Sequence, residues 1–160
     1  MPFTLRSPAF ETGAGIPRRH TCQGADLSPP LTWADPPAGT RSLALTVVDP
    51  DVPDPAAPER SWVHWVVYDL PADVRALPEN AGASAASLPA GARAGRNDWG
   101  RPDYGGPCPP IGRHRYLHRL QALDVVLGDL GTPTRDALLR ATEGHVLGEA
   151  ELLGTYQKER

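Results

Sequence analysis

Three short groups of polar side chains in this chain of 160 residues have the chemistry that a small polar binding site needs. They are Asp49 with Asp51, then His64, and further along His114 with Tyr116. Imidazole nitrogens and a phenolic hydroxyl donate hydrogen bonds to the oxygens of an anion, whereas a carboxylate accepts hydrogen bonds or orients a histidine. Together these groups predict a small polar pocket.

The segment that precedes His114 is rich in glycine and proline. Gly105–Gly112 contains three glycines and three prolines, so we expect a loop and neither a helix nor a central strand. Glycines let a ligand approach the backbone closely. We therefore expect a ligand to be able to reach the backbone N–H groups near Gly106.

The run that begins at His114 is predicted to be a β-strand with one buried face. Alternation places His114, Tyr116 and His118 on one face, together with Leu120 and Ala122. His114 and Tyr116 are then about 7 Å apart along the strand, which leaves room for a phosphate-sized group. His118 is about 13 Å from His114 by the same strand rise, so the two are not expected to share a metal ion. We expect His118 to be a satisfied core or rim histidine.

Each of these polar residues also has a purely structural interpretation. A single histidine at the head of a strand often only packs, and the Asp-Pro-Asp sequence at residues 49–51 is typical of a turn. Trp62, close to Trp65, is typical of a core. What favours a site is that the aspartate and both histidines lie where an apolar strand meets a turn-rich loop, because rigid scaffolds carry binding residues on such loops.

The strands that position these residues are predicted from apolar runs. The runs cover Leu43–Asp49, Trp62–Leu70, His114–Val126 and Glu149–Tyr156, with Phe3–Phe10 and Leu31–Trp33 as edge strands. Nineteen prolines and sixteen glycines divide the rest of the chain into short segments. The pattern predicts a mainly β protein, a two-sheet antiparallel sandwich with one or two short helices.

One helix is predicted between the last two runs. Thr132 has the side chain of an N-cap, Pro133 suits the first helical position and Gly144 suits the C-terminal end. The segment Asn80–Asn97 is rich in Ala, Gly and Ser and has no periodicity. We expect it to be a long surface connection.

Length and composition predict a single globular domain over residues 1–160. A net charge of −3 argues against a nucleic-acid surface, which needs a basic patch. No run approaches the roughly 20 apolar residues of a membrane-spanning helix, and the N-terminus lacks the pattern of a signal peptide. A cytoplasmic location is therefore expected.

The two cysteines, Cys22 and Cys108, are too few for a disulfide scaffold and show no zinc spacing. In a reducing compartment both are expected to be thiols, with a mutual bridge as the alternative. The scattered histidines do not form a metal triad, and no cofactor is predicted.

Several motifs together resemble the phosphatidylethanolamine-binding protein family, which includes Raf kinase inhibitor protein, and in particular its compact bacterial and archaeal branch. Asp49-Pro-Asp-Val-Pro53 with Trp62-Val-His64 is similar to the first signature of the family, and Gly105–Tyr116 is similar to the second. Segments within Thr21–Trp33 and Gly144–Tyr156 are similar as well. The resemblance thus covers nearly the whole chain.

The resemblance implies a β-sandwich with a small anion-binding cavity at one end. It also implies a cis peptide bond between Val52 and Pro53. Carried over motif by motif, the ligand-binding residues would be Asp49, Val52, Pro53, Trp62, His64, Gly106, Pro107, His114 and Tyr116.

These observations lead us to expect reversible binding of phosphate or of a phosphorylated small molecule or head group. If histidine protonation matters, affinity should rise as the pH falls from about 8 to about 6. Asp49 would orient a histidine or meet the ammonium of a zwitterionic ligand. One alternative is a phosphoester hydrolase with an Asp49–His64 pair, although no Gly-x-Ser-x-Gly elbow supplies a nucleophile. Another, which the resemblance permits, is a regulator of a kinase or a protease, and a homodimer is compatible with the compact bacterial relatives.

Overall fold

The computed structural model describes residues 2–159 and contains two antiparallel β-sheets. The five-stranded sheet, in the order β6-β4-β3-β7-β8, consists of β3 (Ser42–Val52), β4 (Arg60–Pro71), β6 (Arg93–Ala94), β7 (His114–Leu123) and β8 (Val146–Tyr156). The three-stranded sheet, in the order β1-β2-β5, consists of β1 (Thr4–Arg6), β2 (Leu31–Ala34) and β5 (Ala76–Leu77). The prediction of a mainly β, two-sheet protein is confirmed.

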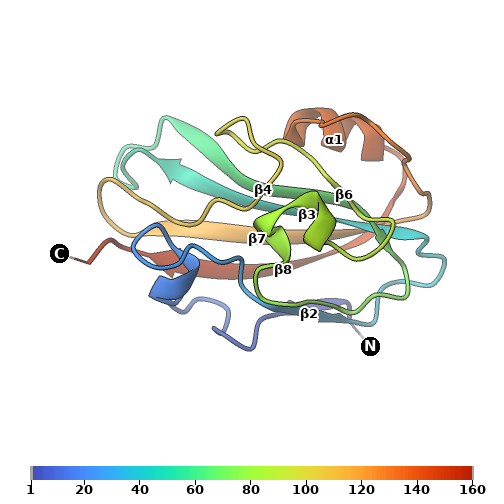
Figure 1. The fold of residues 1–160 in the computed structure, drawn as a ribbon, viewed down its shortest axis with the longest axis horizontal. Coiled ribbons are helices and arrows are strands. Elements are labelled where there is room, and N and C mark those ends of the chain that lie inside the picture. The colour runs from blue at the N-terminus through green and yellow to red at the C-terminus, as the bar shows by residue number, and fades with distance from the viewer. Residues whose placement is uncertain (1, 160) are drawn as a thin grey trace.

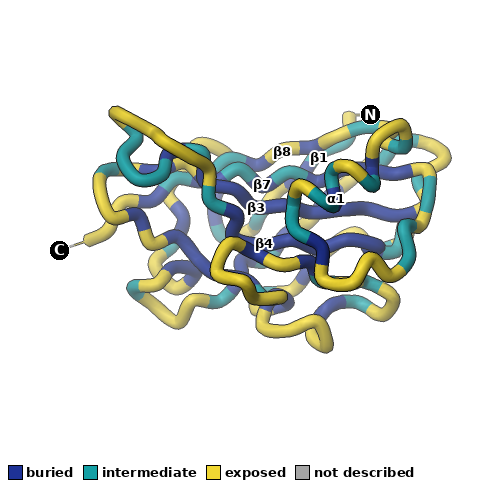
Figure 2. Tube along the Cα trace, turned by 90° about the horizontal axis from the view of Figure 1, so that it is seen from above, coloured by how far each residue is buried: buried dark blue, intermediate teal, exposed yellow. Residues whose placement is uncertain are grey.

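The smaller sheet lies against one face of the larger sheet, and the helix α1 (Arg135–Thr142) lies against the opposite face (Figure 1). The central strands of the larger sheet are consequently buried on both faces, and Figure 2 shows them almost entirely in the colour of buried residues. This explains why the sequences of β3 and β4 are apolar without alternation.

Two hydrophobic clusters correspond to these two faces. The cluster between the sheets includes Leu45 of β3, Trp65 of β4 and Leu120 of β7. The smaller cluster beneath the helix includes Val66 of β4 and Leu138 of α1. Strand β7 shows the predicted alternation at its start, where the even-numbered residues are buried.

Strand register brings the predicted site residues to one end of the larger sheet. Asp49, near the end of β3, lies opposite Trp62, near the start of β4. On the other side of β3, Val48 pairs with Leu117 of β7, so the end of β3 lies beside the start of β7. A shift in the β3–β4 register between Asp49 and Val52 marks the point where the ladder becomes irregular. Loops and strand ends therefore meet at this edge.

The helix begins two residues later than the sequence predicted. Thr134 is the N-cap, since its hydroxyl oxygen accepts a hydrogen bond from the Ala137 N–H at 3.2 Å. Thr132 is therefore not the cap, and Pro133 precedes the helix. Gly144 lies just after the helix with φ +80°, the left-handed conformation that a glycine at a helix C-terminus commonly adopts. Its predicted place at the C-terminal end of the helix is confirmed.

The segment Asn80–Asn97, which the sequence predicted to be a long surface connection, contains short elements of its own. It contains two short 3-10 turns, at Ala81–Ala83 and Ala85–Ser87, and the strand β6, which pairs with β4. A third 3-10 turn, Arg18–His20, lies in the N-terminal part of the chain. None of the helices within residues 2–159 is long and apolar enough to span a membrane.

Candidate functional site

A pocket of about 290 Å³ opens at the edge of the sheet where β3, β4 and β7 bring their polar residues together. Its lining comprises Asp49, Val52, Trp62, His64, Trp99, Cys108, Pro109, Pro110 and Tyr116. Five of the nine residues predicted from the sequence thus line the pocket, namely Asp49, Val52, Trp62, His64 and Tyr116. The other four, Pro53, Gly106, Pro107 and His114, lie outside the lining.

A larger groove, of about 540 Å³, runs between β1 and β8. Its charged lining residues are Arg6, Glu11 and Glu151, and it contains no histidine. The smaller pocket is the better candidate site because it gathers a carboxyl group, an imidazole and a phenol in a concave, partly apolar space.

His114 is fully buried, and protein groups surround both of its ring nitrogens. Nδ1 lies 2.6 Å from Oδ2 of Asp49, and Nε2 lies 2.8 Å from the Ile111 carbonyl and 3.1 Å from the Pro53 carbonyl. Carbonyl oxygens only accept hydrogen bonds, so Nε2 carries a proton. A second proton lies between Nδ1 and Oδ2, which makes the pair neutral as a whole. His114 therefore has no free N–H for a ligand, in contrast to the donor role that the sequence suggested.

Asp49 is likewise held by the protein. Its Oδ1 accepts a hydrogen bond from the Asp51 N–H at 2.7 Å, and its Oδ2 faces His114. Burial raises the pKa of the Asp49 carboxyl, and these two hydrogen bonds partly oppose that effect. The expectation that Asp49 orients a histidine is confirmed, and that histidine is His114.

The neighbouring Asp51 fastens the end of β3 to the start of β7. Its oxygens accept hydrogen bonds from Arg115 Nε at 3.0 Å, Arg115 Nη2 at 2.8 Å and the Arg115 backbone N–H at 2.9 Å. The hydrogen bonds from the Arg115 side chain are the main cause that lowers the pKa of Asp51. Because this fork is bidentate, it fixes the relative position of the two strands that carry Asp49 and Tyr116.

His64 contributes the free imidazole nitrogen of the pocket. Its side chain is 3% exposed, and Nδ1 lies 2.7 Å from the Gly105 carbonyl, so Nδ1 carries a proton. Burial lowers the pKa of His64 to about 4. At neutral pH the ring is therefore uncharged, and Nε2 is a hydrogen-bond acceptor.

Tyr116 contributes a hydroxyl group that is buried and has no hydrogen-bond partner among residues 2–159. Burial raises the pKa of this phenol well above its ordinary value, and the Asp49 carboxylate reinforces the shift because it lies close enough to interact with the hydroxyl, although without a hydrogen bond of normal geometry. The hydroxyl thus stays protonated and can donate. The Tyr116 ring lies edge to face with His64 at 5.2 Å and stacks at 6.5 Å on His114.

Two tryptophans form the aromatic wall of the pocket. The Trp62 and Trp99 rings meet edge to face at 5.6 Å, and Trp99 also contacts His64 at 5.0 Å. Sequence reasoning placed Trp62 in the site and missed Trp99. The signal available in the sequence was the Asn-Asp-Trp-Gly segment at residues 97–100, which is turn-like and lies only four residues before the glycine- and proline-rich loop.

The glycine- and proline-rich loop is shaped by two close approaches. A Cβ atom on Gly105 would overlap with the Trp99 ring, and one on Gly106 would overlap with the Asp26 carboxylate and the His20 carbonyl. The Gly106 N–H donates to Oδ1 of Asp26 at 2.9 Å. This N–H is therefore already used within the protein, contrary to the expectation that a ligand reaches it, and Cys108, Pro109 and Pro110 form the wall instead.

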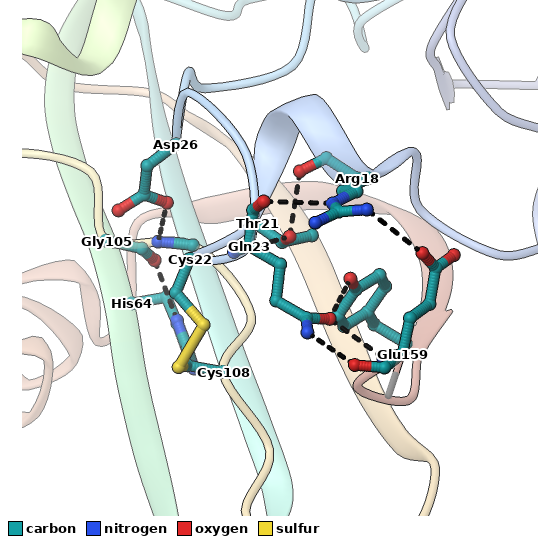
Figure 3. Close-up of a disulfide and its surroundings, with 11 residues drawn as sticks. Arg18, Thr21, Cys22, Gln23, Asp26, His64, Gly105, Cys108 and Glu159 are labelled. Carbon is teal, nitrogen blue, oxygen red and sulfur yellow. Dashed lines mark hydrogen bonds and ion pairs between the residues drawn. A yellow bond between two sulfur atoms is a disulfide. The ribbon is translucent and has the colours of Figure 1, made fainter.

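Cys22 and Cys108 form a disulfide, which corrects the expectation of two thiols (Figure 3). The bridge joins Cys108 in the pocket wall to Cys22 in the segment His20–Asp26. The two cysteines are 86 positions apart in the sequence. The Cys22 N–H also donates to the Pro107 carbonyl at 3.1 Å, and the Tyr104 hydroxyl donates to the His20 carbonyl at 2.8 Å. The wall of the pocket is thus attached to a second, distant loop.

Three further findings concern the residues that the sequence singled out. The Val52–Pro53 peptide bond is cis, as the family resemblance implied. Within residues 2–159, no group of three or more His, Cys, Asp and Glu side chains is arranged to hold a metal ion. His118 is buried as expected, but its Nε2 has no hydrogen-bond partner in this part of the chain, so it is only partly satisfied.

Comparison with known proteins identifies the family of this chain. The family model described as phosphatidylethanolamine-binding protein matches residues 6–157. This chain belongs to that family. A UPF0098 protein from Chlamydia pneumoniae is 49% identical over 154 residues, which cover 96% of this chain and 98% of that protein.

Two crystal structures have the same fold as this member of the family. One is a putative phosphatidylethanolamine-binding protein homologue from Chlamydia trachomatis, with a TM-score of 0.87, 42% identity and 98% of each chain covered. The other is YbcL from E. coli, described as a member of the mammalian PEBP family, with a TM-score of 0.89, 33% identity and coverage of 99% of this chain and 100% of YbcL. The resemblance seen in the sequence is confirmed.

Proposed function

We propose that this chain reversibly binds a small anion, either phosphate or the phosphoryl group of a small molecule or lipid head group, in the pocket lined by Asp49, His64 and Tyr116. The observation that carries the proposal is the buried Tyr116 hydroxyl, which makes no hydrogen bond of normal geometry within residues 2–159 and lies next to His64 in a concave site. A buried polar group without a partner calls for a ligand or a water to satisfy it.

The protonation states of the pocket define how an anion would bind. Tyr116 donates from its hydroxyl, whereas neutral His64 accepts at Nε2. A phosphate monoester loses its last proton near pH 6, so its monoanion has both an acceptor oxygen for Tyr116 and a P–OH donor for His64. We expect one proton to be taken up with the dianion, and affinity to rise as the pH falls from about 8 to about 6 and then to level off.

The aromatic wall gives the proposed ligand a second contact. The Arg101 guanidinium already lies over the Trp99 ring, 5.6 Å from its centroid, so the remaining indole surface of this wall, chiefly that of Trp62, is what suits the ammonium group of a ligand. The Asp49 carboxylate is hydrogen-bonded to His114, so it does not bind the ammonium of a zwitterionic head group in our proposal. The tryptophan wall takes that role.

We further propose that the chain binds its ligand without converting it. The aspartate–histidine pair is Asp49–His114 and not Asp49–His64, and the carbonyls at Nε2 of His114 leave that ring no position for a substrate proton. The pocket lining contains no serine or threonine, and its cysteine is bridged. Both features argue against an activated nucleophile. A kinase or protease partner, a homodimer and a cytoplasmic location remain predictions.

Titration of the protein with inorganic phosphate and O-phosphorylethanolamine, followed by amide NMR signals, tests the proposal. We expect saturable shifts around His64 and Tyr116, and an affinity roughly tenfold lower in Tyr116→Phe because one hydrogen bond to a charged group is lost. Tyr68→Phe is the matched control, since the Tyr68 hydroxyl bonds to the Gly131 carbonyl on the other side of the sheet. Equal affinity of Tyr116→Phe and the wild type would remove Tyr116 from the site and the proposal with it.

A further inference from the structure

A cleft of about 140 Å³, separate from the candidate pocket and from the groove between β1 and β8, lies on the outer face of the five-stranded sheet, beside the first residue of α1. Its lining includes Thr46, Val48, Ser61, Leu117, Arg119 and Arg135. Because side chains alternate along β3, Thr46 and Val48 face this cleft while Asp49 faces the candidate pocket. The two hollows therefore lie on opposite faces of the same strand.

Arg135 is an unsatisfied cation at this cleft. Its side chain is 27% exposed, and its Nε atom is buried without a hydrogen-bond partner among residues 2–159. The acidic contact recorded for it is Asp136, whose Oδ1 is 3.8 Å from Nη1 and whose side chain is 76% exposed. That contact is too long and too solvated to satisfy the guanidinium. A buried guanidinium N–H without an acceptor is costly and calls for a bound group.

Arg119 supplies a second guanidinium from β7. Its Nε is 3.2 Å and its Nη2 is 3.1 Å from Oε1 of Glu151, and Nε is 3.5 Å from Oε2 of Glu149. The contacts of Nε and Nη2 with these two glutamates of β8 fix the position of the Arg119 side chain, and Nη1 takes no part in them. In the β3–β7 ladder Arg119 lies directly opposite Thr46, which is itself buried. A guanidinium and a hydroxyl thus lie side by side on the floor of the cleft.

We infer that this cleft is a second anion site, which binds a single phosphoryl group between Arg135 and Arg119 with the Thr46 hydroxyl as a further donor. Guanidinium groups match the oxygens of a phosphoryl group, and Nε together with an Nη atom forms the preferred bidentate fork. The volume corresponds to about four or five water molecules at roughly 30 Å³ each, which is enough for one phosphoryl group and little more. The inference does not depend on the function proposed for the first pocket.

The side-chain Nε–Hε NMR signal of Arg135 tests the inference. We expect inorganic phosphate, added at constant ionic strength, to shift this signal saturably in the wild type and equally in His64→Ala, where the first pocket is altered. Arg135→Lys keeps the charge but loses Nε, and we expect it to weaken phosphate binding at this cleft at least fivefold, as seen by the amide signals of Thr46 and Arg119. Thr46→Val should weaken it about threefold, a loss of roughly 0.6 kcal/mol.

Arg140→Lys is the matched control, because Arg140 belongs to the same helix and is exposed. A shift of the wild-type Arg135 signal that grows linearly without saturation would show nonspecific attraction and overturn the inference. The same holds if Arg140→Lys weakens phosphate binding, followed by the amide signals of Thr46 and Arg119, as much as Arg135→Lys does. A response that disappears in His64→Ala would also overturn it. O-phosphoserine then separates two sources of the phosphoryl group. Tighter binding than inorganic phosphate indicates an esterified ligand, and weaker binding indicates the free ion.

Discussion

The Asp49 carboxylate and the His114 imidazole lie 2.6 Å apart beside the candidate pocket, and every polar side-chain atom of the two residues has a partner within the protein. This pair joins β3 to β7, and through the carbonyls of Pro53 and Ile111 it also contacts the loop after β3 and the loop before β7. Within residues 2–159, the polar side-chain atoms of the pocket that remain for a ligand include Nε2 of His64 and the hydroxyl of Tyr116. The Asp49–His114 pair therefore holds the strands of the site in place, and His64 and Tyr116 are the residues available to hydrogen-bond a ligand.

Loss of the Asp49 carboxylate is expected to destabilise the fold strongly. Asp49→Ala leaves His114 buried with a proton on a nitrogen that has lost its partner, and removing one member of a buried pair typically costs about 3–5 kcal/mol. Urea unfolding measures the change. The control is Asp124→Ala, which removes the partner of His145 in a pair whose side chains are each 45% exposed. It should cost no more than about 1 kcal/mol, and equal losses in the two variants would refute the assignment.

Acid is expected to unfold the protein through its buried histidines. Burial lowers the pKa of His64 and of His118 to about 4, below the ordinary value of 6.5. Between these values the unfolded chain binds more protons than the folded one, so the free energy of unfolding falls as the pH falls from about 6.5 to about 4. Each histidine accounts for roughly 3 kcal/mol of that loss. Above pH 7 neither contributes to the pH dependence.

His118→Leu separates the two histidines, because it removes the buried imidazole whose Nε2 has no partner in the described chain. Urea unfolding at pH 7, 6, 5 and 4 should show about half of the wild-type acid dependence in this variant. His145→Leu, at an exposed position, should keep the full dependence. An unchanged slope in His118→Leu would mean that His118 is not held neutral by its surroundings.

Reduction of the Cys22–Cys108 disulfide is expected to lower both stability and ligand affinity. The bridge closes a loop of 86 positions, and removing a bridge of this kind typically costs about 2–5 kcal/mol. Cys108 and the two prolines after it line the pocket, so phosphate should bind more weakly when the wall is released from the loop at Cys22. Thermal unfolding and phosphate titration with and without dithiothreitol measure the two effects. The double variant Cys22→Ser/Cys108→Ser should not respond to the reductant, and a wild type that also does not respond would argue against the bridge.

The two threonines around Pro133 are expected to differ in their effect on α1. Thr134→Ala removes the hydroxyl that caps the helix at the Ala137 N–H and should cost about 1 kcal/mol in the free energy of unfolding. Thr132→Ala removes an exposed side chain outside the helix and should cost less than about 0.5 kcal/mol. Urea unfolding distinguishes them, and the reverse order would restore Thr132 as the cap.

The strands of the larger sheet were predictable because their sequences are unusual. The runs in β3 and β4 are apolar without alternation, which is typical of strands covered on both faces, and β7 alternates only where its outer face meets solvent. Helix boundaries were less predictable, since Thr132 and Thr134 flank the same proline and both carry a capping side chain. The choice between them depends on where the preceding loop ends.

The details of the site depended on contacts between distant segments. Asp49, Val52, Trp62, His64 and Tyr116 were found from motifs at strand ends. The sequence does not show that the Gly106 N–H meets Asp26, or that Cys108 meets Cys22, because these partners come from a loop about 80 residues away that packs against the pocket wall. The same holds for the choice of His114 over His64 as the partner of Asp49, which is set by the register of β3 and β7.

The protonation of His64 in the presence and absence of phosphate tests the proposed site most directly. The ¹⁵N chemical shift of Nε2, followed from pH 8 to pH 4, reports whether this atom carries a proton. We predict an unprotonated Nε2 with a pKa of about 4 in the free protein, and an apparent pKa raised by more than about one unit at saturating phosphate, because the bound phosphoryl group shares its proton with this nitrogen. An Nε2 titration that phosphate leaves unchanged would contradict anion binding in this pocket.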